Sequence, residues 1–342
     1  MAYDHSNMNF IHEKRSERYG NGFVRMNPLI CFFYRDESTC DILSSVRYVN
    51  NKMAKKGKRM FLYKRCTEVD TDAIYEAFIA GFSDYIIKMD MSKDNFQKRF
   101  FGPEGNSPEY SVIAFDDHKP VGLILGGIKD YEGLKTLRCG ALCVLPDYRG
   151  TGVSHKLFDL HREIAQENNC SQMLLEVIAG NERAINFYRK KGYKKVYDLV
   201  YYSHSNPYGI NTDLPSGFTV KRTDIDTLRS FSREIRDIHI NWQNDFDYTS
   251  HFYEQIYYGV FKDTNMVGGL SIHPAGRVNF LLVDPSFRNK GIGSGLISHA
   301  VRELDLKKLA ISFPDNASLT GFVKRLGFMK NSITQYEMYM PI

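Results

Sequence analysis

Arg149-Gly150-Thr151-Gly152-Val153-Ser154 returns later in the 342-residue chain as Arg288-Asn289-Lys290-Gly291-Ile292-Gly293. Each copy begins three residues after a proline and follows an apolar run typical of a strand. Each also precedes apolar residues spaced three or four apart, as in a helix. The pattern predicts a strand, a glycine-bearing turn and a helix in both places. Such a turn directs free backbone N–H groups at an anion bound at the start of the helix.

A second block of residues is repeated downstream of the first. It reads Asn181-x-x-Ala184-x-x-Phe187-Tyr188-x-x-x-Gly192-Tyr193 and then Asn316-x-x-Leu319-x-x-Phe322-Val323-x-x-x-Gly327-Phe328. The two copies are 139 residues apart in the first block and 135 apart in the second. Two matched blocks at nearly one offset predict two copies of one domain.

In this order and spacing, the two blocks resemble those of the GCN5-related N-acetyltransferase (GNAT) superfamily, with Ser154 where glycine or alanine is usual. The resemblance implies an α/β protein with two tandem acyl-CoA N-acyltransferase (GNAT) folds, each a mixed, mostly antiparallel sheet flanked by helices. We expect an N-terminal domain at 61–205, a linker at 206–217 and a C-terminal domain at 218–342. Each domain is expected to close with its own last strand, the second near Tyr336–Met340.

Other phosphate-binding patterns fit less well. A P-loop ends in Gly-Lys-Ser/Thr, which neither copy has, and a dinucleotide fingerprint needs Gly-x-Gly-x-x-Gly in the first βα turn. Gly291-Ile292-Gly293-Ser294-Gly295 has another spacing and lies well inside its repeat. A glycine-rich turn without a ligand is the remaining alternative.

Composition excludes several other classes of protein. Residues 1–60 hold eleven Lys and Arg against six Asp and Glu, so this basic extension carries the whole net charge of +5. The repeats therefore lack the basic bias that drives nucleic-acid binding. No apolar run is long enough to span a membrane, and no secretory leader is recognised. Six cysteines lack metal-ligand spacing, so we expect a reduced, cytoplasmic protein without a metal.

The basic extension leaves two interpretations open. It ends in Lys55-Lys56-Gly57-Lys58-Arg59-Met60, immediately before the first strand-like run of the repeats. One hypothesis is that Met60 is the natural start of the protein. The alternative is a poorly ordered basic tail.

The resemblance also implies a chemistry. Members of the superfamily move an acyl group from coenzyme A to an amine, so the expected co-substrate is acetyl-CoA. The residues of both turns, together with Asn181, would bind it. In the family the strand before the turn separates from its neighbour, and its backbone N–H groups would face the thioester. By position these belong to Cys143, Val144 and Leu145.

Two residues of the first copy are candidate proton carriers. Tyr188 stands at the family's tyrosine position and would protonate the departing thiolate, although a tyrosine on such a helix is often only a core residue. Glu176 lies in the apolar run Leu174–Val177, where a carboxylate is costly unless it is paired or functional. This run resembles the Leu-Glu-Val strand of ribosomal-protein and protein N-terminal acetyltransferases, which implies a base; the alternative is a hydrogen bond to nearby backbone.

The second copy lacks both proton carriers. Counted back from Gly327, the tyrosine position holds Val323 and the glutamate position holds Ile311. We infer that the N-terminal copy catalyses. The C-terminal copy would bind coenzyme A without turnover, shape the acceptor site, or use other groups such as Tyr253, His273 or Asp284.

The predicted function is acyl-CoA-dependent N-acyl transfer, with acetyl moving to a primary amine by direct attack through a tetrahedral intermediate. The alternative is a coenzyme A-binding regulatory protein without turnover. The acceptor would be a small-molecule amine, a protein N-terminus or a lysine, and the sequence leaves the oligomeric state open. Candidate walls and carboxylates of the acceptor site are Phe82, Tyr85, Phe96, Asp84, Asp90 and Asp94.

Overall fold

The computed structural model describes residues 59–235 and 237–342, and the expectations for residues 1–58 lie outside this part of the chain. The N-terminal repeat comprises β1 (Leu62–Arg65), α1 (Thr71–Gly81), α2 (Lys93–Phe100), β2 (Ser107–Asp116), β3 (Lys119–Tyr131), β4 (Leu134–Val144), α3 (Val153–Glu167), β5 (Gln172–Ile178), α4 (Glu182–Lys191) and β6 (Lys194–His204). The C-terminal repeat comprises β7 (Phe218–Thr223), α5 (Ile225–Ser232), α6 (Phe246–Ser250), β8 (Ile256–Lys262), β9 (Asn265–Ile272), β10 (Arg277–Val283), α7 (Ile292–Glu303), β11 (Leu309–Pro314), α8 (Ala317–Arg325), β12 (Met329–Lys330) and β13 (Gln335–Pro341).

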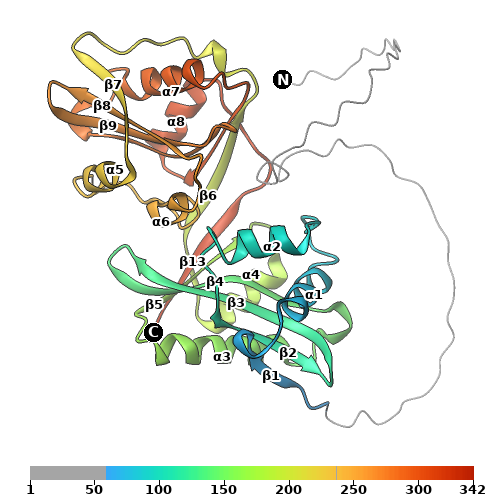
Figure 1. Cartoon of the computed structure of the whole chain (residues 1–342). Coiled ribbons are helices and arrows are strands. Elements are labelled where there is room, and N and C mark those ends of the chain that lie inside the picture. The colour runs from blue at the N-terminus through green and yellow to red at the C-terminus, as the bar shows by residue number, and fades with distance from the viewer. Residues whose placement is uncertain (1–58, 236) are drawn as a thin grey trace, which may run out of the picture. The chain divides into compact units, whose positions relative to one another are not determined.

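The two repeats exchange their last strands. The strands of the described residues join in the order β1-β2-β3-β4-β5-β13-β6-β11-β10-β9-β8-β7, with β12 paired to β6. β13 lies beside β5 of the N-terminal repeat and pairs with it along its whole length (Figure 1). β6 in turn pairs with β11 of the C-terminal repeat. The expectation that each repeat closes with its own last strand is therefore wrong. Either arrangement satisfies the same backbone groups, so the local sequence does not choose between them.

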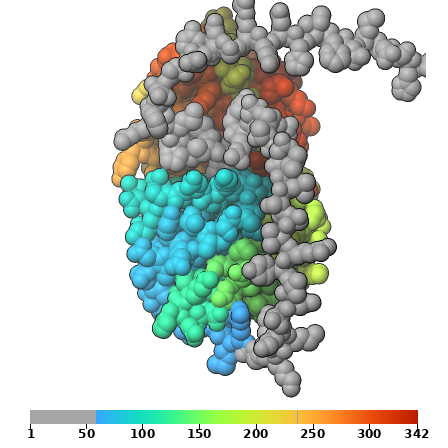
Figure 2. Space-filling view, turned by 90° about the vertical axis from the view of Figure 1, so that its right-hand side faces the viewer, coloured from blue at the N-terminus to red at the C-terminus, as the bar shows by residue number. Residues whose placement is uncertain are grey.

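Helices cover both faces of the N-terminal half of the sheet. α1 and α2 pack on one face through an aromatic-rich core that includes Phe78, Phe96 and Phe100. α3 and α4 pack on the other face around Leu157, Leu175 and other apolar side chains. Figure 2 shows the residues of α1 and α2 as a continuous blue-to-cyan surface of this repeat. The C-terminal repeat is built alike, with α5 and α6 on one face and α7 and α8 on the other.

Local signals account for the positions of the helices. α1 begins after Asp70, whose carboxylate accepts from the Ala73 N–H at 2.8 Å, as an N-cap does. α2 spans Lys93–Phe100 and is capped by Ser92. No helix among the described residues is long and apolar enough to cross a membrane.

Candidate active site

β4 and β5 separate halfway along their length. Their parallel pairing ends at Cys139 and Leu175, although β4 continues to Val144 and β5 to Ile178. A β-bulge at Gly140 follows the last pair and turns β4 away. Cys139 and Leu175 therefore mark the vertex of an opening between the two strands, as the resemblance implies.

The turn between β4 and α3 leaves open space at the start of the helix. Gly150 and Gly152 have φ angles of 76° and 95°, in the left-handed region that favours glycine. A Cβ added at either position would meet no described atom within 4 Å. The first turn of α3 starts with Val153 and Ser154. Among the described residues, no side chain caps this turn. Its free N–H groups suit a pyrophosphate such as that of coenzyme A.

The Arg149 side chain is held by the protein itself. Its guanidinium donates to both carboxylate oxygens of Asp84, at 2.5 and 2.6 Å, and to the Val144 carbonyl at 3.1 Å. This hydrogen-bonded ion pair lowers the pKa of Asp84 to about 2. The carboxylate of Asp84, one of the candidate acceptor-site residues, is thus already paired with Arg149. Arg149 anchors the turn to β4 and to the loop after α1.

One of the three predicted backbone donors faces the opening. The Leu145 N–H donates to the Val121 carbonyl at 3.0 Å, so it is not free, and the prediction for this residue is wrong. Donors alternate along an antiparallel pair, so Cys143, which lies opposite Leu123, also faces β3. Val144 then faces away from β3, in agreement with its carbonyl accepting from Arg149. The alternating direction of backbone N–H groups along a strand would have singled out Val144 among the three predicted donors.

Tyr188 lies at the vertex, on the face covered by α3 and α4. It projects from α4, which begins after Asn181; the Asn181 side chain caps the helix by accepting from the Ala184 N–H at 3.3 Å. The Tyr188 hydroxyl interacts with the Cys139 thiol, and burial, followed by the neighbouring Cys139 and Tyr193, raises its pKa well above the usual value. The hydroxyl is therefore protonated at neutral pH and can act only as a proton donor.

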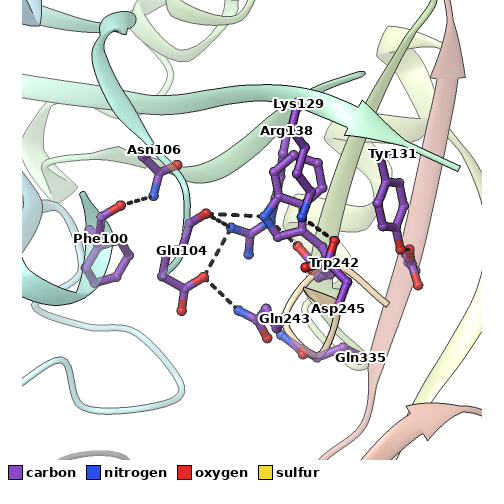
Figure 3. Close-up of polar contacts among 12 residues, drawn as sticks. Phe100, Glu104, Asn106, Lys129, Tyr131, Arg138, Trp242, Gln243, Asp245 and Gln335 are labelled. Atoms are coloured by element: carbon purple, nitrogen blue, oxygen red, sulfur yellow. Dashed lines mark hydrogen bonds and ion pairs between the residues drawn. The ribbon is translucent and has the colours of Figure 1, made fainter. Parts of the chain in front are cut away.

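Glu176 lies at the vertex on the opposite face of the sheet. Its Oε2 accepts from Arg138 Nε at 2.7 Å, and Oε1 is buried without a hydrogen-bond partner in the described residues. Arg138 also donates to the carbonyl and a carboxylate oxygen of Glu104, and Gln243 of the C-terminal repeat donates to the same carboxylate (Figure 3). Burial raises the pKa of Glu176, Arg138 opposes this, and Glu337 adds to it, so that the pKa is raised overall.

Glu337 completes this face of the vertex. It is fully buried on β13, and strand register places it directly opposite Glu176. Its carboxylate accepts from Tyr339 at 2.6 Å and interacts with His239 Nε2 at 3.1 Å. The other ring nitrogen of His239 contacts Glu132. Burial alone would lower the pKa of His239, but the two carboxylates outweigh burial and raise it to about 9.

The C-terminal repeat retains the conformation of the turn, but the linker lies beside it. Asn289 and Gly291 have φ angles of 61° and 82°, and Arg288 contacts Asp237 and the Val283 carbonyl as Arg149 contacts its partners. A Cβ at Gly291, the equivalent of Gly152, would meet only the linker residue Pro215, at 3.9 Å, whereas one at Gly295, within α7, would meet the linker residue Leu214 at 3.0 Å. Lys290 lies over the Phe287 ring, and Ile292 is buried.

The C-terminal vertex also differs from the N-terminal one. β10 and β11 pair only up to Val278 and Ile311, and a bulge at Asn279 follows. Ile311 is thus the equivalent of Leu175, and Ser312, not Ile311 as counted from the sequence, stands at the place of Glu176. Asn244 donates to the carbonyl and to the hydroxyl of Ser312, at 2.8 and 3.0 Å. Neutral hydrogen bonds occupy the place of the carboxylate.

Arg138 is not among the residues predicted from the sequence. It has a counterpart 139 residues later, Arg277, which begins β10. Arg138 donates to the Glu104 carbonyl and Arg277 to the Gln243 carbonyl, both at 3.0 Å. An arginine repeated at the offset of the first block is a signal that could have identified this position.

Several predicted acceptor-site residues have other roles. Phe96 is fully buried in the core beneath α2, so it cannot line a site. Asp90 and Asp94 are exposed, whereas Phe82 and Tyr85 are half-buried and contact each other. In the C-terminal repeat Asp284 accepts from the Ser286 N–H, His273 accepts from the Ala275 N–H, and Tyr253 is fully exposed.

Comparison with known proteins agrees with this geometry. The sequence profile of the Acetyltransferase (GNAT) family matches residues 71–193 and 224–328, more than half of the chain. The protein therefore belongs to the GNAT family and contains two copies of its fold. Proteins of this family are N-acyltransferases that use acyl-coenzyme A.

Individual relatives and solved structures agree with the family. N-alpha-acetyltransferase 30 of Schizosaccharomyces pombe is 30% identical over 95 residues, which are 26% of this chain and 63% of that protein. A GCN5-related N-acetyltransferase from Sphaerobacter thermophilus has a TM-score of 0.59 at 13% identity, over 82% of this chain and 95% of the other. A tandem GNAT protein from the clavulanic acid biosynthesis pathway has a TM-score of 0.58 at 13% identity, over 82% and 98%. At these identities the solved structures establish the fold alone.

Proposed function

We propose that the protein transfers acetyl from acetyl-CoA to a primary amine and that the N-terminal repeat carries the reaction. The observation that carries this proposal is the vertex between β4 and β5. It has Tyr188 on one face and Glu176 on the other, and its C-terminal equivalent has Val323 and Ser312. A thioester entering the opening would have a proton donor near its sulfur and a carboxylate near the approaching amine.

The proposed residues divide the proton transfers between them. Glu176 would take a proton from the acceptor ammonium through its unpartnered Oε1, which leaves a neutral amine to attack the thioester carbon. The Val144 N–H faces the opening and would stabilise the oxyanion. As the carbon–sulfur bond breaks, Tyr188 would protonate the thiolate, and the phenolate would recover a proton from the amide nitrogen being formed.

We propose one acetyl-CoA site in each chain. The open space beside Gly152 supports binding at α3, whereas the linker residues Pro215 and Leu214, which lie beside Gly291 and Gly295, argue against a second site. Native mass spectrometry with acetyl-CoA tests this stoichiometry. One bound equivalent, lost in Gly152→Val and retained in Gly291→Val, supports the proposal. Two equivalents would contradict it, and the absence of binding would refute the acetyl-CoA function as a whole.

We propose a peptide α-amino group as the first acceptor class to test, because the fission yeast relative is an N-alpha-acetyltransferase. Peptides with different first residues, together with small primary amines, are incubated with acetyl-CoA, and released thiol is measured. Glu176→Gln and Tyr188→Phe should each lower kcat/KM by about 10²- to 10⁴-fold. Ser312→Ala, the matched change in the C-terminal repeat, should leave it unchanged. A loss confined to Ser312→Ala would reverse the assignment, and binding without transfer to any acceptor would favour a regulatory protein.

A further inference from the structure

The strand exchange brings a carboxylate of the C-terminal repeat to the vertex of the N-terminal repeat. Glu337 lies on β13 and is paired directly with Glu176 on β5. Directly opposed residues of an antiparallel pair project from the same face, with Cβ atoms about 5 Å apart. Glu337 is fully buried, so little water screens its charge from Glu176.

A rigid set of partners holds Glu337 in place. The Tyr339 hydroxyl donates to it at 2.6 Å, and His239 binds it while also contacting Glu132. Both ring nitrogens of His239 face carboxylates, so both donate and the ring is an imidazolium. The ring stacks on Tyr197 with centroids 4.2 Å apart. Glu337 therefore cannot move away from Glu176 without breaking these contacts.

Two other groups act directly on Glu176: Arg138 of β4 lowers its pKa, and Glu104, from the segment after α2, raises it less than Glu337 does. Cys139, on the other face of β4, and Tyr201 of β6 interact with it only through their charges. Arg138 is divided between Glu176 and Glu104, with hydrogen bonds of 2.7 and 3.1 Å. With Arg138 alone, Glu176 would be a stable ion pair and a weak base. A second carboxylate opposes that pairing.

We propose that Glu337 is a positioning residue for Glu176: the C-terminal repeat supplies a buried carboxylate that keeps the proton affinity of the base high enough to deprotonate an ammonium group. The inference rests on the proposed function of Glu176. It gives the C-terminal repeat a role in the reaction that does not require that repeat to bind a substrate.

A titration of the ligand-free full chain tests the inference without any acceptor. Glutamate is labelled with ¹³C at the side-chain carboxyl, and the Glu176 resonance is identified by its absence in Glu176→Gln. Its titration midpoint is then compared in the wild type, Glu337→Gln and Glu337→Asp. Glu337→Gln should lower the midpoint by about one to two pH units, the order of magnitude expected for a neighbouring carboxylate in a buried setting. Glu337→Asp keeps the charge and should stay near the wild type.

Glu132→Gln is the matched control. It also removes a carboxylate beside His239, but Glu132 is about half exposed and is not paired with Glu176. Its effect on the Glu176 midpoint should be a few tenths of a pH unit at most. A wild-type midpoint in Glu337→Gln, or the same shift in Glu337→Asp, would overturn the inference. These results do not depend on finding an acceptor, so failure of the proposed function appears separately, as a lack of acetyl transfer.

Discussion

His239 should make the stability of this protein fall between neutral and alkaline pH. The pKa of His239 is raised to about 9 in the folded protein, because Glu132 and Glu337 outweigh the effect of burial. In the unfolded chain the pKa of a histidine is about 6.5. The imidazolium therefore stabilises the fold fully below about pH 6.5, and this contribution is lost as the pH rises through about 9.

The size of the effect follows from the same two values. A difference of about 2.5 pH units corresponds to about 3 kcal/mol of unfolding free energy at low pH, at about 1.4 kcal/mol per unit. The His239 side chain is only 8% exposed, so solvent screening removes little of this value. Nearly all of it should be lost between about pH 6 and about pH 10.

Urea unfolding followed by tryptophan fluorescence measures this loss. Trp242 is the one tryptophan of the chain, is buried, and lies three residues from His239. Between the two pH values, the urea midpoint of the wild type should fall by about 1 M more than that of His239→Gln. His118→Gln changes an exposed histidine in the β2–β3 turn and should behave as the wild type. Equal pH dependence in the wild type and His239→Gln would refute the reasoning.

Four further changes test other parts of the structure. Gly152→Val should weaken acetyl-CoA binding at least tenfold by calorimetry, since the left-handed φ of 95° costs a side chain about 1–2 kcal/mol and its atoms enter the open space. Gly140→Ala should lower the unfolding free energy by about 1–3 kcal/mol, because its Cβ would lie 2.0 Å from Asn106 Oδ1. Gly133→Ala, with no described atom within 4 Å, should lower it by only about 1 kcal/mol in the same urea assay. The fragment 61–205 lacks β13 and should not form a cooperatively folded monomer by circular dichroism and gel filtration; such a monomer would show that another strand can cover β5.

Features that depend on neighbouring residues could be predicted from the sequence. α2 can be recognised in the sequence because Ser92 caps it and its apolar side chains recur at helical spacing. The turn at Gly150 and Gly152 was recognisable because a left-handed backbone favours glycine. The family follows from two such local blocks in order.

Features that depend on strand pairing could not be predicted. The exchange of β6 and β13 is a choice between two distant partners with the same backbone hydrogen bonds. The assignment of Ile311 to the glutamate position failed for a related reason: counting back from Gly327 crosses segments that differ in length between the repeats. The register of β10 with β11 places Ser312 there instead.

If the proposed roles of Tyr188 and Glu176 hold, the strand exchange explains why a repeat without these two residues remains joined to one that has them. Without β13, β5 would have no partner along the edge that Glu337 now covers, and Met338 would leave the core that holds Tyr188. The segment before α6 adds to this dependence, because Trp242 and Gln243 both donate to Glu104, the second carboxylate bound by Arg138. At the C-terminal vertex Asn244 forms neutral hydrogen bonds with Ser312. In the proposed reaction the C-terminal repeat needs no base, so it can do without a carboxylate there. In the proposed reaction, the divergence of the repeats is a division of roles within one sheet, in which the second repeat supports the carboxylate of the first.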